Sequence, residues 1–179
     1  MKKNKTSKNW IRKKHKDQFF KLSKIQGYRS RSSFKLIEIN KKFNFLKKDT
    51  NLLDLGSSPG GWSQVAQKII NKGKILAVDR KSMERIKNVE FLQGDFSDEK
   101  ISNKISNFFN NKIDVVVSDI AENTSGNKEL DSYRTGELCL KAMDLSLKLL
   151  HSDGVFLSKL FMGSIFDEIN KKANKHFKK

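Results

Sequence analysis

Short apolar segments that alternate with amphipathic ones constrain the fold of this chain more than any other feature. The apolar segments have the length of strands and span residues 51–55, 74–79, 89–93, 113–118 and 155–161. Strands that alternate with helices predict βαβ units and a parallel sheet. Right-handed crossovers then give a doubly wound α/β sheet with a ligand crevice at the carboxyl ends of its strands.

The segments between these strands carry apolar residues at helical spacing. Ser30 or Ser32 would cap the first expected helix. The sequence contains no internal repeat, so we expect a single domain over residues 28–179, preceded by a basic N-terminal arm over residues 1–27. The expected helices span residues 30–43, 62–71, 101–109, 136–150 and 165–177.

The chain is strongly basic, with 37 Lys and Arg against 20 Asp and Glu and a formal net charge of +17. Such a charge attracts polyanions, and nucleic acid is the first candidate. A codon bias toward lysine would give a similar composition without RNA binding. The basic N-terminal arm has two possible roles. Its aromatic residues Trp10, Phe19 and Phe20 could stack on RNA bases, or they could pack an otherwise solvated tail onto the body of the domain.

The single cysteine, Cys139, excludes an internal disulfide framework, and we expect it to be buried in an apolar helix. The three histidines lack metal-ligand spacing, so we predict no metal site. No segment has the length and apolar character of a membrane span or a signal peptide. These features favour a cytoplasmic protein with no membrane partner.

The strongest local motif is a glycine-rich turn between the first expected strand and the helix that follows it. The turn contains Gly56, Gly60 and Gly61 and ends at Trp62. Glycines permit a sharp turn and a close approach of ligand to backbone, while the helix start directs free N–H groups at the crevice. The glycine spacing fits neither the dinucleotide fingerprint nor the P-loop. We therefore predict a nucleotide-type site of another kind.

Acidic residues lie at the ends of four successive expected strands, at Asp54, Asp79, Asp95 and Asp119. An acid at the end of the second strand can accept both ribose hydroxyls of an adenosine. The acid after the third strand could bond the adenine amino group. Each acid alone would also serve as a helix cap. Four of them beside a glycine-rich turn indicate a pocket shaped for adenosine.

Lys159 is the most informative single residue, because it lies within the last expected strand. Burying an unpaired lysine is costly, which points to a functional partner. Lysine is also common enough in this chain to occur there by chance. With the usual strand order, Lys159 and Asp119 lie on adjacent strands at the crevice, where a carboxylate and an amine would reach one substrate.

Five motifs make the chain resemble the FtsJ/RrmJ family, whose members methylate ribose 2′-oxygens of RNA. The resemblance extends from Trp10 to Glu168. It implies a Rossmann-like methyltransferase fold with S-adenosyl-L-methionine as cofactor, and a uridine of 23S ribosomal RNA in the large ribosomal subunit as target. The motifs are RSRSSFKL at residues 29–36, DLGSSPGGWSQ at 54–64, LQGDF at 92–96, SDIA at 118–121 and SKLF at 158–161.

The family has a Lys-Asp-Lys-Glu catalytic tetrad, and the resemblance places its first three members at Lys35, Asp119 and Lys159. Our hypothesis is that Lys159 acts as the general base, since an uncharged amine can remove the proton of the 2′-hydroxyl. The cation of Lys35 and the cofactor's sulfonium would favour the uncharged amine. The carboxylate of Asp119 would favour the charged amine instead, so its expected role is to orient Lys159 and the cofactor.

The resemblance also implies the residues that contact cofactor and RNA. Basic side chains are expected to hold RNA by its phosphates, which positions the RNA without reading its sequence. The expected RNA-binding residues are Arg29, Arg31 and Lys35. The expected cofactor contacts are Gly60, Trp62, Asp79, Asp95 and Asp119.

The chain departs from the family in two places. The family's fourth tetrad member, a Glu, lies in a strand well beyond the helix after the lysine strand, and this chain ends at Lys179. We therefore expect the C-terminal antiparallel strand pair to be absent, the Lys159 strand to form an open sheet edge, and turnover to suffer more than cofactor binding. Glu122 replaces a proline that the family usually has in a substrate-facing loop.

Three alternatives stay open at this point. The chain could be a catalytically impaired RNA-binding remnant of the family, or a methyltransferase for tRNA. It could also be a nucleotide-binding α/β protein of another chemistry, although the glycine spacing argues against this. The modified nucleotide, the use of naked RNA or an assembled subunit, and the oligomeric state do not follow from the sequence.

Overall fold

The computed structural model describes residues 17–110, 113–121 and 125–178. Its centre is a five-stranded sheet with the order β3-β2-β1-β4-β5, and each neighbouring pair of strands is parallel. The predicted doubly wound α/β fold is therefore confirmed. The strands are β1 Leu52–Leu55, β2 Ile75–Asp79, β3 Glu90–Gln93, β4 Ile113–Ser118 and β5 Leu150–Ser158.

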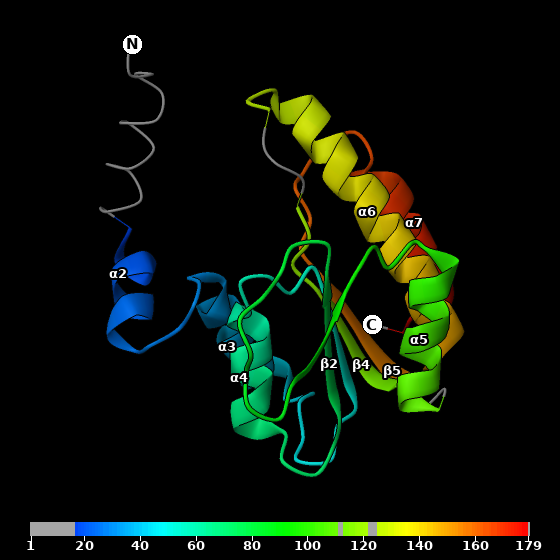
Figure 1. Ribbon diagram of the computed structural model, residues 1–179. Helices are drawn as coiled ribbons and strands as arrows, with labels where there is room; N and C mark the ends of the chain where they lie inside the picture. The colour runs from blue at the N-terminus through cyan, green and yellow to red at the C-terminus, as the bar shows by residue number, and fades with distance from the viewer. Residues whose placement is uncertain (1–16, 111–112, 122–124, 179) are drawn as a thin grey trace.

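Six described helices flank the sheet and complete a three-layer architecture. They are α2 Gln18–Ile25, α3 Ser32–Phe43, α4 Gly61–Ile69, α5 Glu99–Phe109, α6 Lys128–Leu149 and α7 Phe166–His176. The first three lie on one side of the sheet and the last three on the other (Figure 1). The alternation of strands and helices along the chain thus places helices on both faces.

Alternation of side chains along the strands divides the core into two layers. Leu52 of β1 and Ile75 of β2 belong to the layer that includes α3 and α4. Leu53 and Leu76 belong to the layer that includes α5 and α6. A strand turns successive side chains to opposite faces. Asp54 therefore shares the face of Leu52 and lies on the α4 side of the sheet.

Two elements differ from the sequence prediction by more than two residues at one end or both. α6 begins at Lys128 rather than at residue 136, because the Asn127 side chain accepts hydrogen bonds from the first free backbone N–H groups of the helix. The first turns of α6 are largely exposed, so they carry no apolar pattern. β5 starts earlier than predicted and ends at Ser158, which places Lys159 just beyond the strand.

The described part of the basic arm forms α2, a helix that the sequence analysis did not predict. The ring of Phe19 packs against the ring of Phe34 in α3, with 5.7 Å between centroids. The cap position of α3 is Arg31 and no side chain caps this helix, so the prediction of a serine cap is wrong. Trp10 lies outside the described residues. The buried state predicted for Cys139 is confirmed.

Packing between α6 and α7 depends on the absence of a side chain at Gly136. A Cβ there would lie 2.1 Å from Cγ2 of Ile165, the buried residue next to α7. Gly136→Ala gains about 1 kcal/mol of helix propensity, but overpacking costs about 1–3 kcal/mol. We expect a net loss of about 1 kcal/mol in the free energy of unfolding, measured by urea denaturation. Unchanged stability would contradict the tight packing.

The strand order reverses next to β1. The chain runs from β1 to β2 and β3 on one side, and then to β4 and β5 on the other. Doubly wound folds bind ligands at such a switch point, outside the carboxyl ends of the strands, which lie toward the top of Figure 1. No helix in the described ranges combines the length and apolar character that a membrane crossing requires.

Candidate active site

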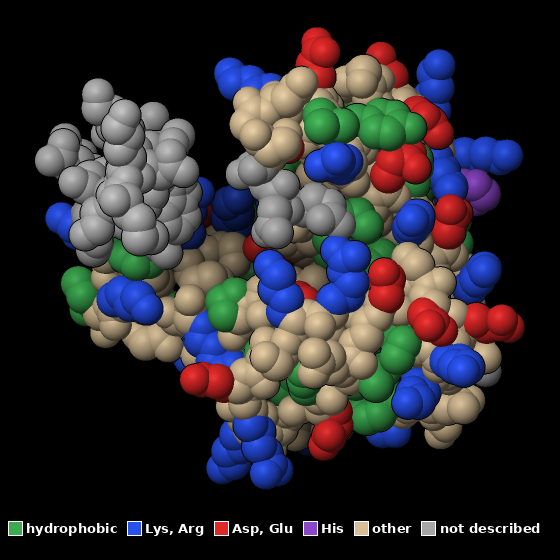
Figure 2. Space-filling model, turned by 45° about the horizontal axis from the view of Figure 1, so that its top comes forward, with side chains coloured by type: hydrophobic (Ala, Val, Ile, Leu, Met, Phe, Trp, Pro, Cys, Tyr) green, Lys and Arg blue, Asp and Glu red, His purple; other side chains and the backbone are tan. Residues whose placement is uncertain are grey.

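Two adjacent cavities open at the carboxyl ends of β1, β2 and β4. The first, of about 200 Å³, lies beside the ends of β2 and β3, and the second, of about 230 Å³, lies between the glycine-rich turn and the start of α3. Gly56, Ser58 and Asp119 line both cavities, which therefore share one wall. Figure 2 looks onto this rim, where Lys and Arg side chains stand around a hollow.

Asp79 and Asp95 line the first cavity. The Asp79 carboxylate accepts hydrogen bonds from the backbone N–H groups of Ser58 at 2.9 Å and Lys81 at 2.7 Å, which fix its orientation. The Asp95 carboxylate accepts one from the N–H of Ser97 at 2.9 Å. Both acids are half-buried, and each carboxylate has further lone pairs for a ligand.

The glycine-rich turn depends on positions that exclude a side chain. Gly56 has φ +72°, and a Cβ there would lie 2.3 Å from Cγ1 of Ile120. Gly60 has φ +109° and is absent from the lining of both cavities, so its predicted cofactor contact stays a prediction. Trp62 lines the second cavity, and its indole N–H donates to the carbonyl of Ser32 at 2.9 Å, joining α4 to α3.

Asp54 places a fully buried carboxyl group against the second cavity. One carboxyl oxygen accepts a hydrogen bond from the Ser63 hydroxyl at 2.6 Å, and the other has no partner among the described residues. The pKa of Asp54 is raised to about 7; burial is the largest cause, the Ser63 hydrogen bond opposes it, and the nearby carboxylates of Asp119 and Asp79 contribute to the rise. The group is therefore partly protonated near neutral pH.

Lys159 forms an ion pair with Asp119, which lines both cavities; Lys159 itself is not among the lining residues of either cavity. Nζ of Lys159 lies 2.7 Å from Oδ1 of Asp119 and donates a hydrogen bond to the Asp119 backbone carbonyl at 2.9 Å. The Nζ–Oδ1 contact lacks hydrogen-bond alignment, so it acts through charge. The two side chains are only 20% and 19% exposed, and the contact is therefore less screened by water than one at the surface.

The three residues expected to bind RNA differ in their surroundings. Lys35 is exposed on α3 and forms no ion pair or hydrogen bond within the described part of the chain, so it is not paired with Asp119. Arg31 lines the second cavity and pairs with the carboxylate that caps α2. The Arg29 guanidinium donates to backbone carbonyls instead of standing free for phosphate.

Sequence reasoning missed two contributors to this site. Ser63 fixes the Asp54 carboxyl, and the strand alternation that turns Asp54 toward α4 would have pointed to it. Leu138 of α6 lines the first cavity, and helical periodicity alone gives no signal for that contact.

A family model described as FtsJ-like methyltransferase matches residues 28–179. The chain belongs to the FtsJ-like methyltransferase family. Ribosomal RNA large subunit methyltransferase E of Pelagibacter ubique (strain HTCC1062) is 46% identical over 178 residues, covering 99% of this chain and 88% of that relative. The protein of the same name from Acinetobacter baylyi (strain ATCC 33305 / BD413 / ADP1) is 42% identical over 171 residues, covering 94% of this chain and 79% of the relative.

A solved structure has the same fold as this FtsJ-like methyltransferase. The crystal structure of a ribosomal RNA methyltransferase from Plasmodium falciparum is 32% identical and superposes with a TM-score of 0.75, covering 83% of this chain and 86% of that one. The predicted family and enzyme class are confirmed. The division into arm and domain and the roles of single residues stay predictions. No group of three or more metal-ligating side chains occurs in the described ranges.

Proposed function

We propose that this FtsJ-like methyltransferase transfers a methyl group from S-adenosyl-L-methionine to a ribose 2′-oxygen, with a uridine of large-subunit ribosomal RNA as target. The observation that carries the proposal is the ion pair of Lys159 with Asp119, the carboxylate that lines both cavities. The names of relatives that match nearly the whole chain support ribosomal RNA as the partner. Such a substrate would be met in the cytoplasm.

The first cavity fits the adenosyl part of the cofactor. Asp79 would accept the ribose hydroxyls, as acids at this strand end do in related folds. Asp95 would accept the adenine amino group. Asp119 adds negative charge under the glycine-rich turn, which suits a cationic ligand, and the unpartnered oxygen of the partly protonated Asp54 lies beside it. S-adenosyl-L-methionine supplies a methyl group already activated on a sulfonium.

Lys159 is our candidate for removing the proton of the 2′-hydroxyl. The amine must be uncharged to accept that proton. The Asp119 carboxylate lies 2.7 Å from Nζ and fixes the position of the amine. We infer that Asp119 orients Nζ beside the two cavities that Asp119 lines. The free amine then takes the hydroxyl proton and passes it to solvent.

Arg31 and Lys35 are the proposed RNA-binding residues at the mouth of the second cavity. Arg31 lines this cavity, and Lys35 is exposed further along α3. Their cationic side chains suit phosphates on either side of the target nucleotide. The second cavity is then the place for the acceptor ribose, next to Lys159 and opposite the adenosyl cavity.

Two measurements on the full chain test the proposal. Calorimetric titration with S-adenosyl-L-methionine is expected to show one site per chain. Transfer of a labelled methyl group to large ribosomal subunits that lack these methyl groups is expected to place the label in 2′-O-methyluridine. Naked ribosomal RNA and tRNA serve as comparison substrates.

Each outcome of these measurements has one interpretation. Absence of binding heat would overturn the cofactor assignment. Cofactor binding without transfer to any RNA would make the chain an impaired remnant, and label in tRNA alone would change the substrate.

A further inference from the structure

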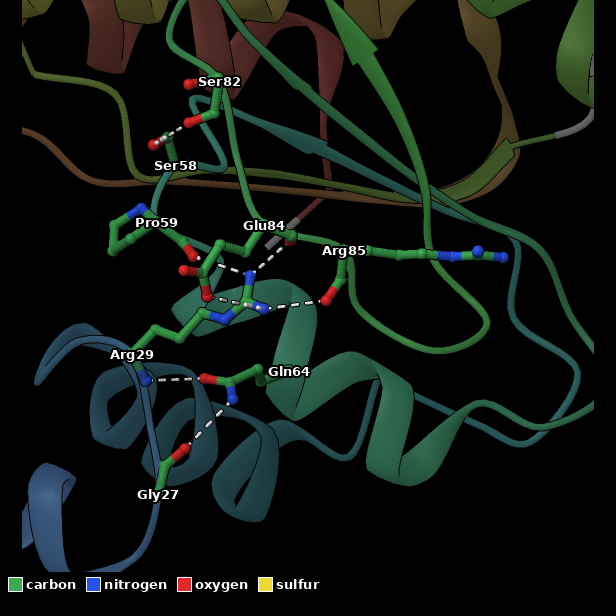
Figure 3. A network of polar contacts seen from close by, with 8 residues as sticks. All are labelled: Gly27, Arg29, Ser58, Pro59, Gln64, Ser82, Glu84 and Arg85. Atoms are coloured by element: carbon green, nitrogen blue, oxygen red, sulfur yellow. Dashed lines mark hydrogen bonds and ion pairs between the residues drawn. The ribbon is translucent and has the colours of Figure 1, made fainter.

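Arg29 connects two loops that are far apart in the sequence. Its Nη1 donates hydrogen bonds to the carbonyl of Pro59 at 3.2 Å and to that of Glu84 at 2.7 Å, and its Nη2 donates to the carbonyl of Arg85 at 2.9 Å (Figure 3). The Glu84 carboxylate is 3.8 Å away but 92% exposed, so it adds little. The guanidinium thus acts mainly on backbone oxygens of both loops.

These two loops form walls of the proposed cofactor site. Pro59 belongs to the glycine-rich turn, whose Gly56 and Ser58 line the first cavity. Glu84 and Arg85 lie in the loop between β2 and β3, whose first residues, Arg80 and Lys81, line the first cavity. The β2–β3 loop contains no described helix, so its position depends on contacts that cross to other segments.

The surroundings of Arg29 hold its side chain in place. Its backbone N–H donates to Oε1 of Gln64 in α4 at 2.7 Å, and Nε2 of Gln64 donates to the carbonyl of Gly27 at 3.2 Å (Figure 3). A Cβ at Gly60 would lie 3.0 Å from Nη1 of Arg29, so the glycine leaves room for the guanidinium. The anchored backbone and the space beside Gly60 together allow the guanidinium to reach both loops.

We propose that Arg29 is a positioning residue for the cofactor site, which sets the spacing between the glycine-rich turn and the β2–β3 loop; this inference rests on the proposed function. The planar guanidinium reaches three carbonyls at once, whereas a lysine ammonium is a compact charge on a flexible stem. This role replaces phosphate binding as the reason for an arginine at this position.

The test compares Arg29→Lys and Arg29→Ala with the unmodified full chain. We expect Arg29→Ala to raise the Kd for S-adenosyl-L-methionine about 10-fold or more, because charge-assisted hydrogen bonds to both walls are lost. Arg29→Lys should recover only part of the affinity. The KM for S-adenosyl-L-methionine should rise in parallel, while the KM for ribosomal particles stays within about twofold.

Two controls separate positioning from general destabilisation. Arg85→Ala removes an exposed side chain that points away from the network and keeps the carbonyl, so the Kd should not change (Figure 3). Gly136→Ala destabilises the chain on the other side of the sheet and should leave the Kd unchanged at temperatures well below melting.

The possible results distinguish this inference from the proposed function. No binding by the unmodified chain would overturn both. Tight binding by the unmodified chain together with unchanged affinity in both Arg29 variants would overturn the inference alone. A raised KM for ribosomal particles with unchanged cofactor affinity would assign Arg29 to RNA instead.

Discussion

Replacing Lys159 with alanine is expected to slow methyl transfer by about 100- to 10,000-fold, the usual contribution of a positioned general base. The ammonium group lies against Asp119, which lines both cavities and holds it through the ion pair and the backbone carbonyl. Lys159→Arg should be nearly as slow, because a guanidinium keeps the positive charge but cannot give up its proton. The measurement is single-turnover transfer of labelled methyl groups to ribosomal particles.

The matched control for this variant is Lys172→Ala. Lys172 lies in α7 and also forms an ion pair, with 2.5 Å from its Nζ to Oδ1 of Asp144, but it is remote from both cavities. The Lys172→Ala variant should keep the normal rate of methyl transfer. A Lys159→Ala chain that retains more than about one tenth of the rate would remove the general-base assignment.

Asp54→Asn is expected to change how stability depends on pH. The folded state holds the Asp54 proton up to about pH 7, whereas an ordinary aspartate, with a pKa of 3.8, has lost it. The native state therefore binds more protons than the unfolded state between these values. This contribution to stability is complete below pH 3.8, is lost as the pH rises to about 7, and changes little above that.

The effect is large enough to measure by urea denaturation. Between pH 5 and pH 8 the wild-type free energy of unfolding should fall by up to about 3 kcal/mol through this group. Asparagine has no such proton and can still accept the Ser63 hydroxyl bond. The other titrating groups are common to both proteins, so the difference between the two curves isolates Asp54. Parallel curves over this range would contradict the prediction.

The sheet and the glycine-rich turn were predictable because their signals are local. Apolar runs such as residues 113–118 identify strands by themselves, and a turn that excludes side chains must contain glycine. The adjacency of Asp119 and Lys159 followed from strand order alone. Family resemblance was needed to single out Lys35, since an exposed lysine on a helix carries no signal of its own.

Features that depend on distant backbone groups escaped the sequence analysis. Arg29 was expected to bind RNA, but its acceptors are carbonyls 30 to 56 residues away, and no side chain marks them. The helix α2 forms because its apolar side chains pack on α3, which helical propensity alone does not predict. The burial of Asp54 required the position of α4 over β1.

The wall that joins the two cavities also bears on inhibition. Because Gly56, Ser58 and Asp119 face both, a single compound that carries an adenosyl unit and a nucleoside on a short tether would occupy both at once. Once one unit is bound, binding of the second unit is intramolecular, at an effective concentration of about millimolar. The length of the tether then decides how much affinity is gained. Because the two cavities share these lining residues, a linker of only a few atoms is favoured.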